Sequence, residues 1–96
     1  IASIDRHVLD LVCQELMQHP GITLAFNLSG MTVGNESWLA DLEKACAKRP
    51  DIAGRMIIEI TETAAFSEET NGGEFVRRLR KLGCHVALDD FGAGYT

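Results

Sequence analysis

Three short apolar segments alternate with stretches of helical periodicity along this chain of 96 residues. The apolar segments are residues 22–28, 56–61 and 84–88, and we interpret them as strands. Strands that are separated by helices pair in parallel through right-handed crossover connections. Their nearly continuous apolar character indicates that both faces of the sheet are covered. The pattern therefore predicts a parallel α/β fold, either an open doubly wound sheet or part of a (β/α)8 barrel.

Helical segments are predicted before the first and second strands. The first helix is expected to be capped by Ser3 and to end at His19-Pro20-Gly21. The second helix is expected to begin near Asn35 or Ser37 and to end before Pro50. The apolar stripe of the first helix is Ile4, Val8, Leu11, Val12 and Leu16, and the second carries Trp38, Leu39, Leu42, Ala45 and Cys46.

A third helix is predicted from about Glu74, because the glycine pair at 72–73 weakens the segment before it. Gly83 is a favourable residue for the position just after the helix end. Basic residues gather near that end, where they complement the helix dipole. They are Arg77, Arg78, Arg80 and Lys81, and the inward residues are Phe75, Val76, Leu79 and Leu82.

Length and composition limit the chain to one domain or part of one. A complete barrel needs roughly 250 residues, so this chain would form only a portion of it. The net charge of −5 gives no basic stripe for duplex nucleic acid, and no apolar run approaches the length of a membrane span. The chain begins with Ile1, so we expect an excised piece.

The three cysteines of the chain lack a C-x-x-C motif and are expected to be buried, reduced thiols: Cys13, Cys46 and Cys84.

Oxygen-bearing side chains follow each strand at its carboxyl end. Because side chains alternate along a strand, Asn27, Glu59 and Asp89 are predicted to share one face and to converge at one edge of the sheet. Asp90 adds a second carboxylate, and adjacent carboxylates repel unless a positive charge lies nearby. A divalent cation such as Mg²⁺ is the usual partner of such a group. The sequence therefore predicts a metal site at the mouth of the sheet.

Each of these residues also has a purely structural explanation. Asn27 is also suited to a turn, and Glu59 could form a salt bridge with a lysine or arginine. Asp89 and Asp90 could form a helix cap or an Asx turn before the glycine. His85 lies early on the third strand and is interpreted as a core histidine. The occurrence of an oxygen ligand on three successive strands favours the functional interpretation.

Three segments resemble the EAL-domain family, the cyclic-di-GMP phosphodiesterases of bacterial signalling. They are Asn27-Leu28-Ser29, Ile58-Glu59-Ile60-Thr61-Glu62-Thr63, and Leu88-Asp89-Asp90-Phe91-Gly92-Ala93-Gly94-Tyr95. The resemblance implies a modified TIM barrel of which this chain is the central part. The Glu-Ala-Leu signature itself does not occur in the chain, nor do the downstream lysine and the later acidic residues. The domain expected over residues 1–96 is therefore a partial EAL domain.

The resemblance also implies individual roles. Asn27, Glu59 and Asp89 would be ligands of one catalytic Mg²⁺ or Mn²⁺, and Asp90 a ligand of a second ion. Glu59, Asp89 and Asp90 would thus be the catalytic residues. Glu62 would anchor the mobile loop that begins at Phe91–Thr96, which in the family couples metal binding to dimerisation. Two positions depart from the common pattern, with Ala93 in place of Thr and Thr96 in place of Ser.

The expected activity of the intact parent is two-metal hydrolysis of cyclic-di-GMP to the linear dinucleotide. The alternative is a degenerate domain that binds the nucleotide or a partner without cleaving it. A kinase is excluded, although Asp90-Phe91-Gly92 occurs in kinases, because His-Arg-Asp and a glycine-rich phosphate loop are missing.

The expected partners are a second copy of the chain and flanking sensor or diguanylate cyclase domains. The domain is expected in the cytoplasm, with membrane tethering of the parent left open, and the isolated chain is expected to be inactive.

Overall fold

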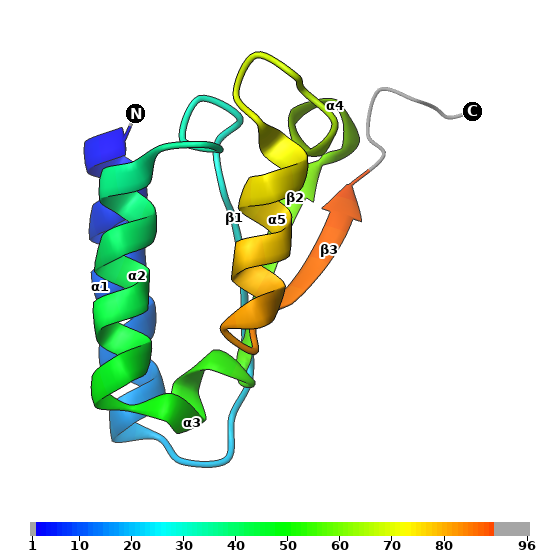
Figure 1. Cartoon of the computed structure of the whole chain (residues 1–96). Helices are drawn as coiled ribbons and strands as arrows, with labels where there is room; N and C mark the ends of the chain where they lie inside the picture. Colours follow the sequence, from blue (N-terminus) through cyan, green and yellow to red (C-terminus); the bar gives the residue numbers. More distant parts are fainter. Residues whose placement is uncertain (1, 90–96) are drawn as a thin grey trace.

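The fold was examined in a computed structural model that describes residues 2–89 (Figure 1). Helices and strands alternate along the chain, as the sequence predicts, and two further helices of one turn each are present. In chain order the elements are α1 (Ala2–Gln18), β1 (Leu24–Asn27), α2 (Glu36–Lys48), α3 (Pro50–Ala53), β2 (Met56–Thr61), α4 (Glu62–Ala65), α5 (Gly72–Lys81) and β3 (His85–Asp89).

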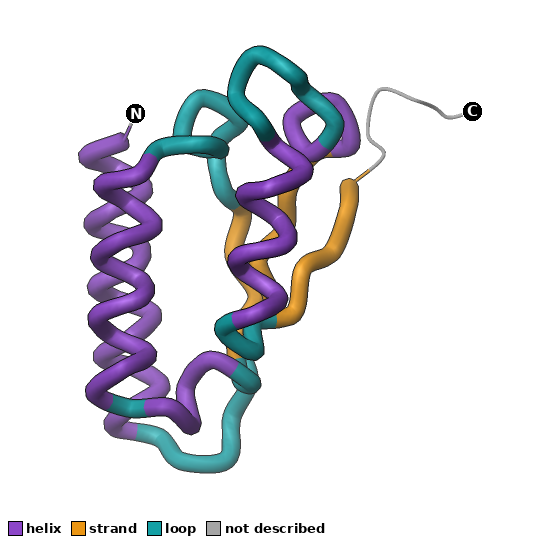
Figure 2. Tube along the Cα trace, viewed as in Figure 1, coloured by secondary structure: helices purple, strands orange, loops and turns teal. Residues whose placement is uncertain are grey.

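The three strands form one parallel sheet in the order β1-β2-β3, with the helices gathered beside it (Figure 2). The side chains of Met56, Ile58 and Ile60 are fully buried, and they join buried side chains of the helices in a single hydrophobic core. On the opposite face Ile57 and Glu59 are half-buried. Within residues 2–89 the helices therefore pack on one face of the sheet, and the expectation that both faces are covered is not met.

The buried stripe of α1 differs from the predicted one. Ile4 and Leu11 belong to the predicted stripe but are 63% and 47% exposed. Ser3 lies inside the helix instead of capping it. The observed stripe follows the spacing i, i+4, i+7, i+8, i+11 and consists of Asp5, Leu9, Val12, Cys13 and Leu16. This stripe was not predicted because its first member, Asp5, is an acid. The cost of burying the Asp5 carboxylate is compensated by the hydrogen bonds that it accepts.

Strand β1 is shorter than predicted because its length is set by its neighbour. The parallel pairing begins where Leu24 lies opposite Met56, the first residue of β2. Residues 22 and 23 have no strand beside them and are exposed. Strand β2 has the predicted bounds, and α2 begins after Asn35, whose side chain accepts a hydrogen bond of 2.9 Å from the amide of Trp38.

Helix α5 begins two residues before the predicted start. A Cβ atom on Gly72 would lie 2.2 Å from the carbonyl oxygen of Ala64, so only glycine permits α5 to start this close to α4. The glycine that was expected to weaken the helix is thus required by packing. At the other end, Gly83 has φ +103° and ends the helix as predicted.

The three cysteines are buried and free, as predicted. Burial raises the pKa of Cys13 from 9.0 to about 11. A hydrogen bond with Cys46 and burial together raise the pKa of Cys84. Cys13 and Cys84 are therefore protonated, chemically quiet thiols at neutral pH, and they act as part of the core.

Candidate metal-binding edge

The carboxyl ends of the three strands meet at one edge of the sheet, drawn at the top of Figure 1. In the register of the sheet Asn27 lies directly beside Glu59, and Glu59 lies beside Ala87. Asp89 follows Ala87 by two residues, so its side chain is on the same face and one step nearer the edge. Adjacent strands are about 4.8 Å apart, so Asn27 and Glu59 are direct neighbours. Asp89 lies one strand away from Glu59 and about 7 Å further along the strand direction.

Two of these residues, Glu59 and Asp89, line an open depression of ≈ 350 Å³ together with Ala87 and Leu88. Asn27 lies beside it on the neighbouring strand β1. Asn27 and Asp89 are exposed, and Glu59 is half-buried on the central strand. Their oxygens, one amide and two carboxylates, are the ligand type that Mg²⁺ and Mn²⁺ prefer. Within residues 2–89, no three His, Cys, Asp or Glu side chains group as a metal site. The two carboxylates and the amide are therefore a partial ligand set.

Glu62 follows the central strand at the same edge. It is the first residue of α4 and is exposed. The hydroxyl of Thr61 caps this short helix by accepting a hydrogen bond of 3.1 Å from the amide of Ala64. Thr61 is also the register partner of Asp89, so Glu62 begins directly beside that strand end. Asp90 and the segment Phe91–Thr96, to which roles were also assigned, lie outside the described residues.

The loop after β1 is held by a residue that the sequence did not single out for the site. Asp5 of α1 is only 7% exposed, and its carboxylate accepts hydrogen bonds from Ser29 and Thr32 of this loop. The one signal in the sequence is an acid at the first position of a buried i, i+4, i+7, i+8 stripe.

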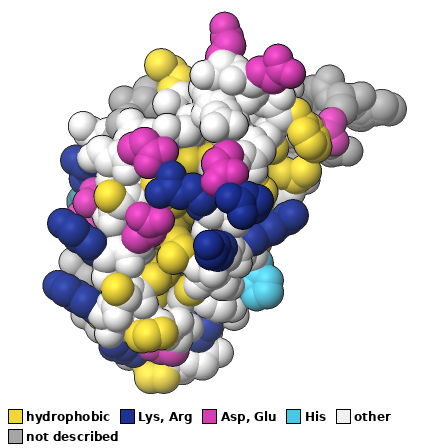
Figure 3. Space-filling view, viewed as in Figure 1, with side chains coloured by type: hydrophobic (Ala, Val, Ile, Leu, Met, Phe, Trp, Pro, Cys, Tyr) yellow, Lys and Arg dark blue, Asp and Glu magenta, His cyan; other side chains and the backbone are white. Residues whose placement is uncertain are grey.

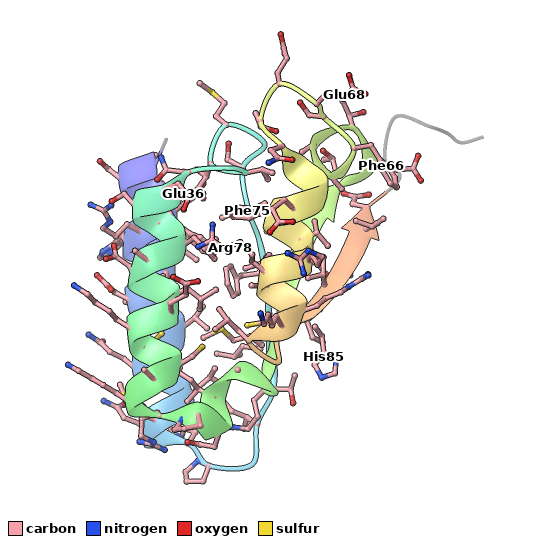
Figure 4. All side chains as sticks on the ribbon, viewed as in Figure 1. Glu36, Phe66, Glu68, Phe75, Arg78 and His85 are labelled. Carbon is pink, nitrogen blue, oxygen red and sulfur yellow. The ribbon has the colours of Figure 1, made fainter. Side chains whose placement is uncertain are left out.

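His85 does not belong to the core, so the interpretation as a core histidine is wrong. It is exposed at the start of β3, as Figure 4 shows, on the outer strand of the described sheet. It lies opposite Ile57, four residues before Asp89 and thus about 13 Å from the carboxyl edge. An outer strand buries fewer of its side chains than a central one, which explains the exposure.

A larger depression of ≈ 470 Å³ lies between α2 and α5, but most of its charged side chains already form ion pairs. Arg78 contacts Glu36 at 2.9 Å and Glu43 at 3.2 Å, and Arg77 contacts Glu74 at 2.7 Å. The basic and acidic side chains intermingle on this face (Figures 3 and 4). This depression is therefore a network of surface ion pairs, which contributes little to stability and offers no convergent set of unpaired groups.

Comparison with known proteins identifies many relatives. Cyclic di-GMP phosphodiesterase PdeF of Escherichia coli is 30% identical over 91 residues, which cover 95% of this chain and 12% of the relative. PdeB of Shewanella oneidensis, another cyclic di-GMP phosphodiesterase, is 41% identical over 74 residues, or 76% of this chain and 8% of the relative. The chain thus spans about one eighth or less of the length of these two relatives.

Solved structures confirm the predicted class of fold. The phosphodiesterase PaMucR in complex with c-di-GMP matches with a TM-score of 0.81 and 24% identity, over 99% of this chain and 43% of that chain. The S helix-GGDEF-EAL protein LapD of Vibrio cholerae matches with a TM-score of 0.82 and 21% identity, over 99% of this chain and 24% of that chain. The family pattern described as the EAL domain matches residues 1–96. The chain therefore belongs to the EAL-domain family.

Proposed function

We propose that this chain is the central part of an EAL domain that hydrolyses cyclic-di-GMP to the linear dinucleotide in a reaction dependent on Mg²⁺ or Mn²⁺. The observation that carries the proposal is the register of the sheet, in which Asn27 adjoins Glu59 and Asp89 lies on the same face at the edge. Family membership and the phosphodiesterase names of the relatives support the same conclusion.

The chain's own residues would bind and orient the ions. Glu59 is fixed on the central strand between two neighbours, so its carboxylate is the most rigidly placed of the three. Asn27 provides a neutral oxygen and Asp89 a second charged one, while Asp90 is proposed for a second ion. Bound divalent ions supply Lewis acidity and lower the pKa of a water molecule. Glu62, at the start of α4 beside Asp89, is proposed to anchor the loop that follows Asp90.

The proposal also covers the localisation, the oligomeric state and the flanking domains of the protein. We place the domain in the cytoplasm, as a homo-oligomer whose parent carries sensor or diguanylate cyclase domains. The GGDEF-EAL arrangement of the LapD structure and the bifunctional diguanylate cyclase/cyclic di-GMP phosphodiesterase MucR of Pseudomonas aeruginosa support flanking domains of this kind. Within residues 2–89, none of the helices has the length and apolar character needed to span a membrane.

The test is an assay of the complete EAL domain that contains this chain, with cyclic-di-GMP and either Mg²⁺ or Mn²⁺. We expect metal-dependent formation of the linear dinucleotide that is abolished by a chelator. The Asp89→Asn variant is expected to lose more than about 100-fold in turnover, because even residues that only support metal ligands contribute 10–100-fold. The control is Asp10→Asn, the same chemical change at an exposed position of α1.

Two results would contradict the proposal in different ways. Full turnover by Asp89→Asn would show that this carboxylate is not a ligand. Binding of cyclic-di-GMP without turnover by the unaltered domain would instead place the protein among the degenerate domains that act as nucleotide receptors.

A further inference from the structure

A buried carboxylate of α1, that of Asp5, contacts the loop that follows β1 and Asn27. One oxygen of Asp5, Oδ2, accepts two hydrogen bonds from the loop between β1 and α2: one of 3.3 Å from the amide of Ser29 and one from the hydroxyl of Thr32. Asp5 is 7% exposed and Thr32 is fully buried. A carboxylate costs free energy when it is buried, so it persists here because its bonds to the loop compensate that cost.

The bond from Thr32 belongs to a closed ring that joins α1, the loop and α2. From Thr32 the ring continues through its carbonyl, which accepts a hydrogen bond of 2.9 Å from the amide of Asn35. The side chain of Asn35 accepts one of 2.9 Å from the amide of Trp38, and the indole Nε1 of Trp38 donates one of 3.3 Å to the carbonyl of Asp5. Each member thus fixes the next, and the loop has one defined conformation.

This ring is connected to the chain two residues after Asn27. The amide of Leu28 donates a hydrogen bond of 2.9 Å to the carbonyl of Glu59, and the next amide, that of Ser29, donates to Asp5. The two residues that follow Asn27 are therefore held by the central strand and by α1 in succession. Removal of the second of these contacts releases the backbone at Ser29, two residues after Asn27, and leaves only the bond of Leu28 to the central strand.

We propose that Asp5 is a positioning residue, whose carboxylate holds the β1–α2 loop and thereby fixes the Asn27 side chain beside Glu59. The inference rests on the proposed function for the role of Asn27 as a metal ligand. A ligand that is misplaced by even 1 Å loses much of its effect, so the hydrogen bonds of Asp5 are expected to govern metal affinity without contact to the metal.

The test compares variants of the complete EAL domain. Asp5→Leu keeps the approximate shape of the side chain and removes both acceptors, whereas Asp5→Asn retains one oxygen that can accept both hydrogen bonds. Thr32→Val removes one donor and serves as the milder variant if Asp5→Leu does not fold. Ile52→Ala is the control for general destabilisation, because Ile52 is buried in α3 at the opposite end of the strands.

Two measurements are made on each variant: the dissociation constant of Mn²⁺ and the hydrogen exchange of the loop amides. Asp5→Leu is expected to weaken Mn²⁺ binding at least tenfold and to accelerate exchange of the amides of Ser29 and Thr32 at least tenfold. Thr32→Val is expected to act in the same direction by less, and Asp5→Asn to restore values near those of the unaltered domain. Ile52→Ala is expected to leave the Mn²⁺ dissociation constant unchanged and to accelerate the exchange of the loop amides no more than that of other amides.

The inference is overturned if Asp5→Leu and Thr32→Val match Ile52→Ala in both measurements, because Asp5 would then have only a general structural role. It is also overturned if exchange accelerates while Mn²⁺ affinity stays within twofold, because the loop would then not control the ligand. Failure of the proposed function itself is recognised separately, since the unaltered domain would then bind no Mn²⁺ at the strand edge.

Discussion

At the scale of single residues, the proposed site depends on Glu59, which the central strand holds between two neighbours. Glu59→Gln preserves the shape of the side chain and one oxygen, but removes the charge that a divalent ion requires. We expect the complete domain to fold normally and to lose at least about tenfold in Mn²⁺ affinity. Calorimetric titration with Mn²⁺ checks the affinity, and the urea midpoint checks the fold. Unaltered affinity would remove Glu59 from the ligand set.

The positions of Asn27, Glu59 and Asp89 were predictable because they follow from strand alternation alone. In a parallel sheet, a polar residue at the end of each strand reaches the same edge whatever the helices do. The roles of the residues were not predictable from periodicity and came from the resemblance. Asp5 was missed because burial of a carboxylate depends on Ser29 and Thr32, which are 24 and 27 residues away in sequence.

At the scale of elements, the long helices and the strands were predictable and the one-turn helices were not. Helices α3 and α4 have four residues each, which is too short for a periodic pattern. They form from local signals instead, a proline in the first turn of α3 and the cap by Thr61 in α4. The start of α5 escaped prediction for another reason, because it is decided by the approach of α4 and not by helix propensity.

The two glycines at the start of α5 are expected to differ in their tolerance of a side chain. In Gly72→Ala the new Cβ would lie 2.2 Å from the carbonyl oxygen of Ala64, so the backbone must shift, and we expect a loss of about 1–3 kcal/mol. Gly73 has no atom within 4 Å of the added Cβ, so Gly73→Ala is expected to stabilise the domain by about 0.4–1 kcal/mol. Urea unfolding measures both. Equal effects would show that α4 and α5 are not packed this closely.

At the scale of the whole molecule, the described part of the chain exposes unpaired strand edges and apolar side chains. Within the described residues β1 and β3 each pair on one side only, and Phe66 and Met31 are 70% and 78% exposed. Such edges and apolar side chains favour association between copies. We therefore expect the 96-residue chain, when isolated, to form oligomers whose mass in light scattering rises with concentration. A monomer at every concentration would contradict this expectation.

The buried thiol of Cys13 is expected to lower the stability of the whole fold at alkaline pH. Burial, with smaller effects of Cys46 and Asp10, raises the pKa of Cys13 from 9.0 to about 11. In the unfolded chain this thiol ionises near pH 9, whereas in the folded protein it stays protonated. Its contribution to the free energy of unfolding is therefore complete below about pH 9 and is lost as the pH rises towards 11.

We expect the urea midpoint of the complete domain to fall over this interval, and to fall less steeply in Cys13→Ala. The comparison uses the slope with pH, so the small cavity that alanine leaves affects both ends of the interval equally. Ala47→Ser on the exposed face of α2 serves as the control, since it alters no ionisable group. Equal slopes in all three proteins would show that Cys13 ionises as readily in the folded protein as in the unfolded chain, and would contradict the raised pKa.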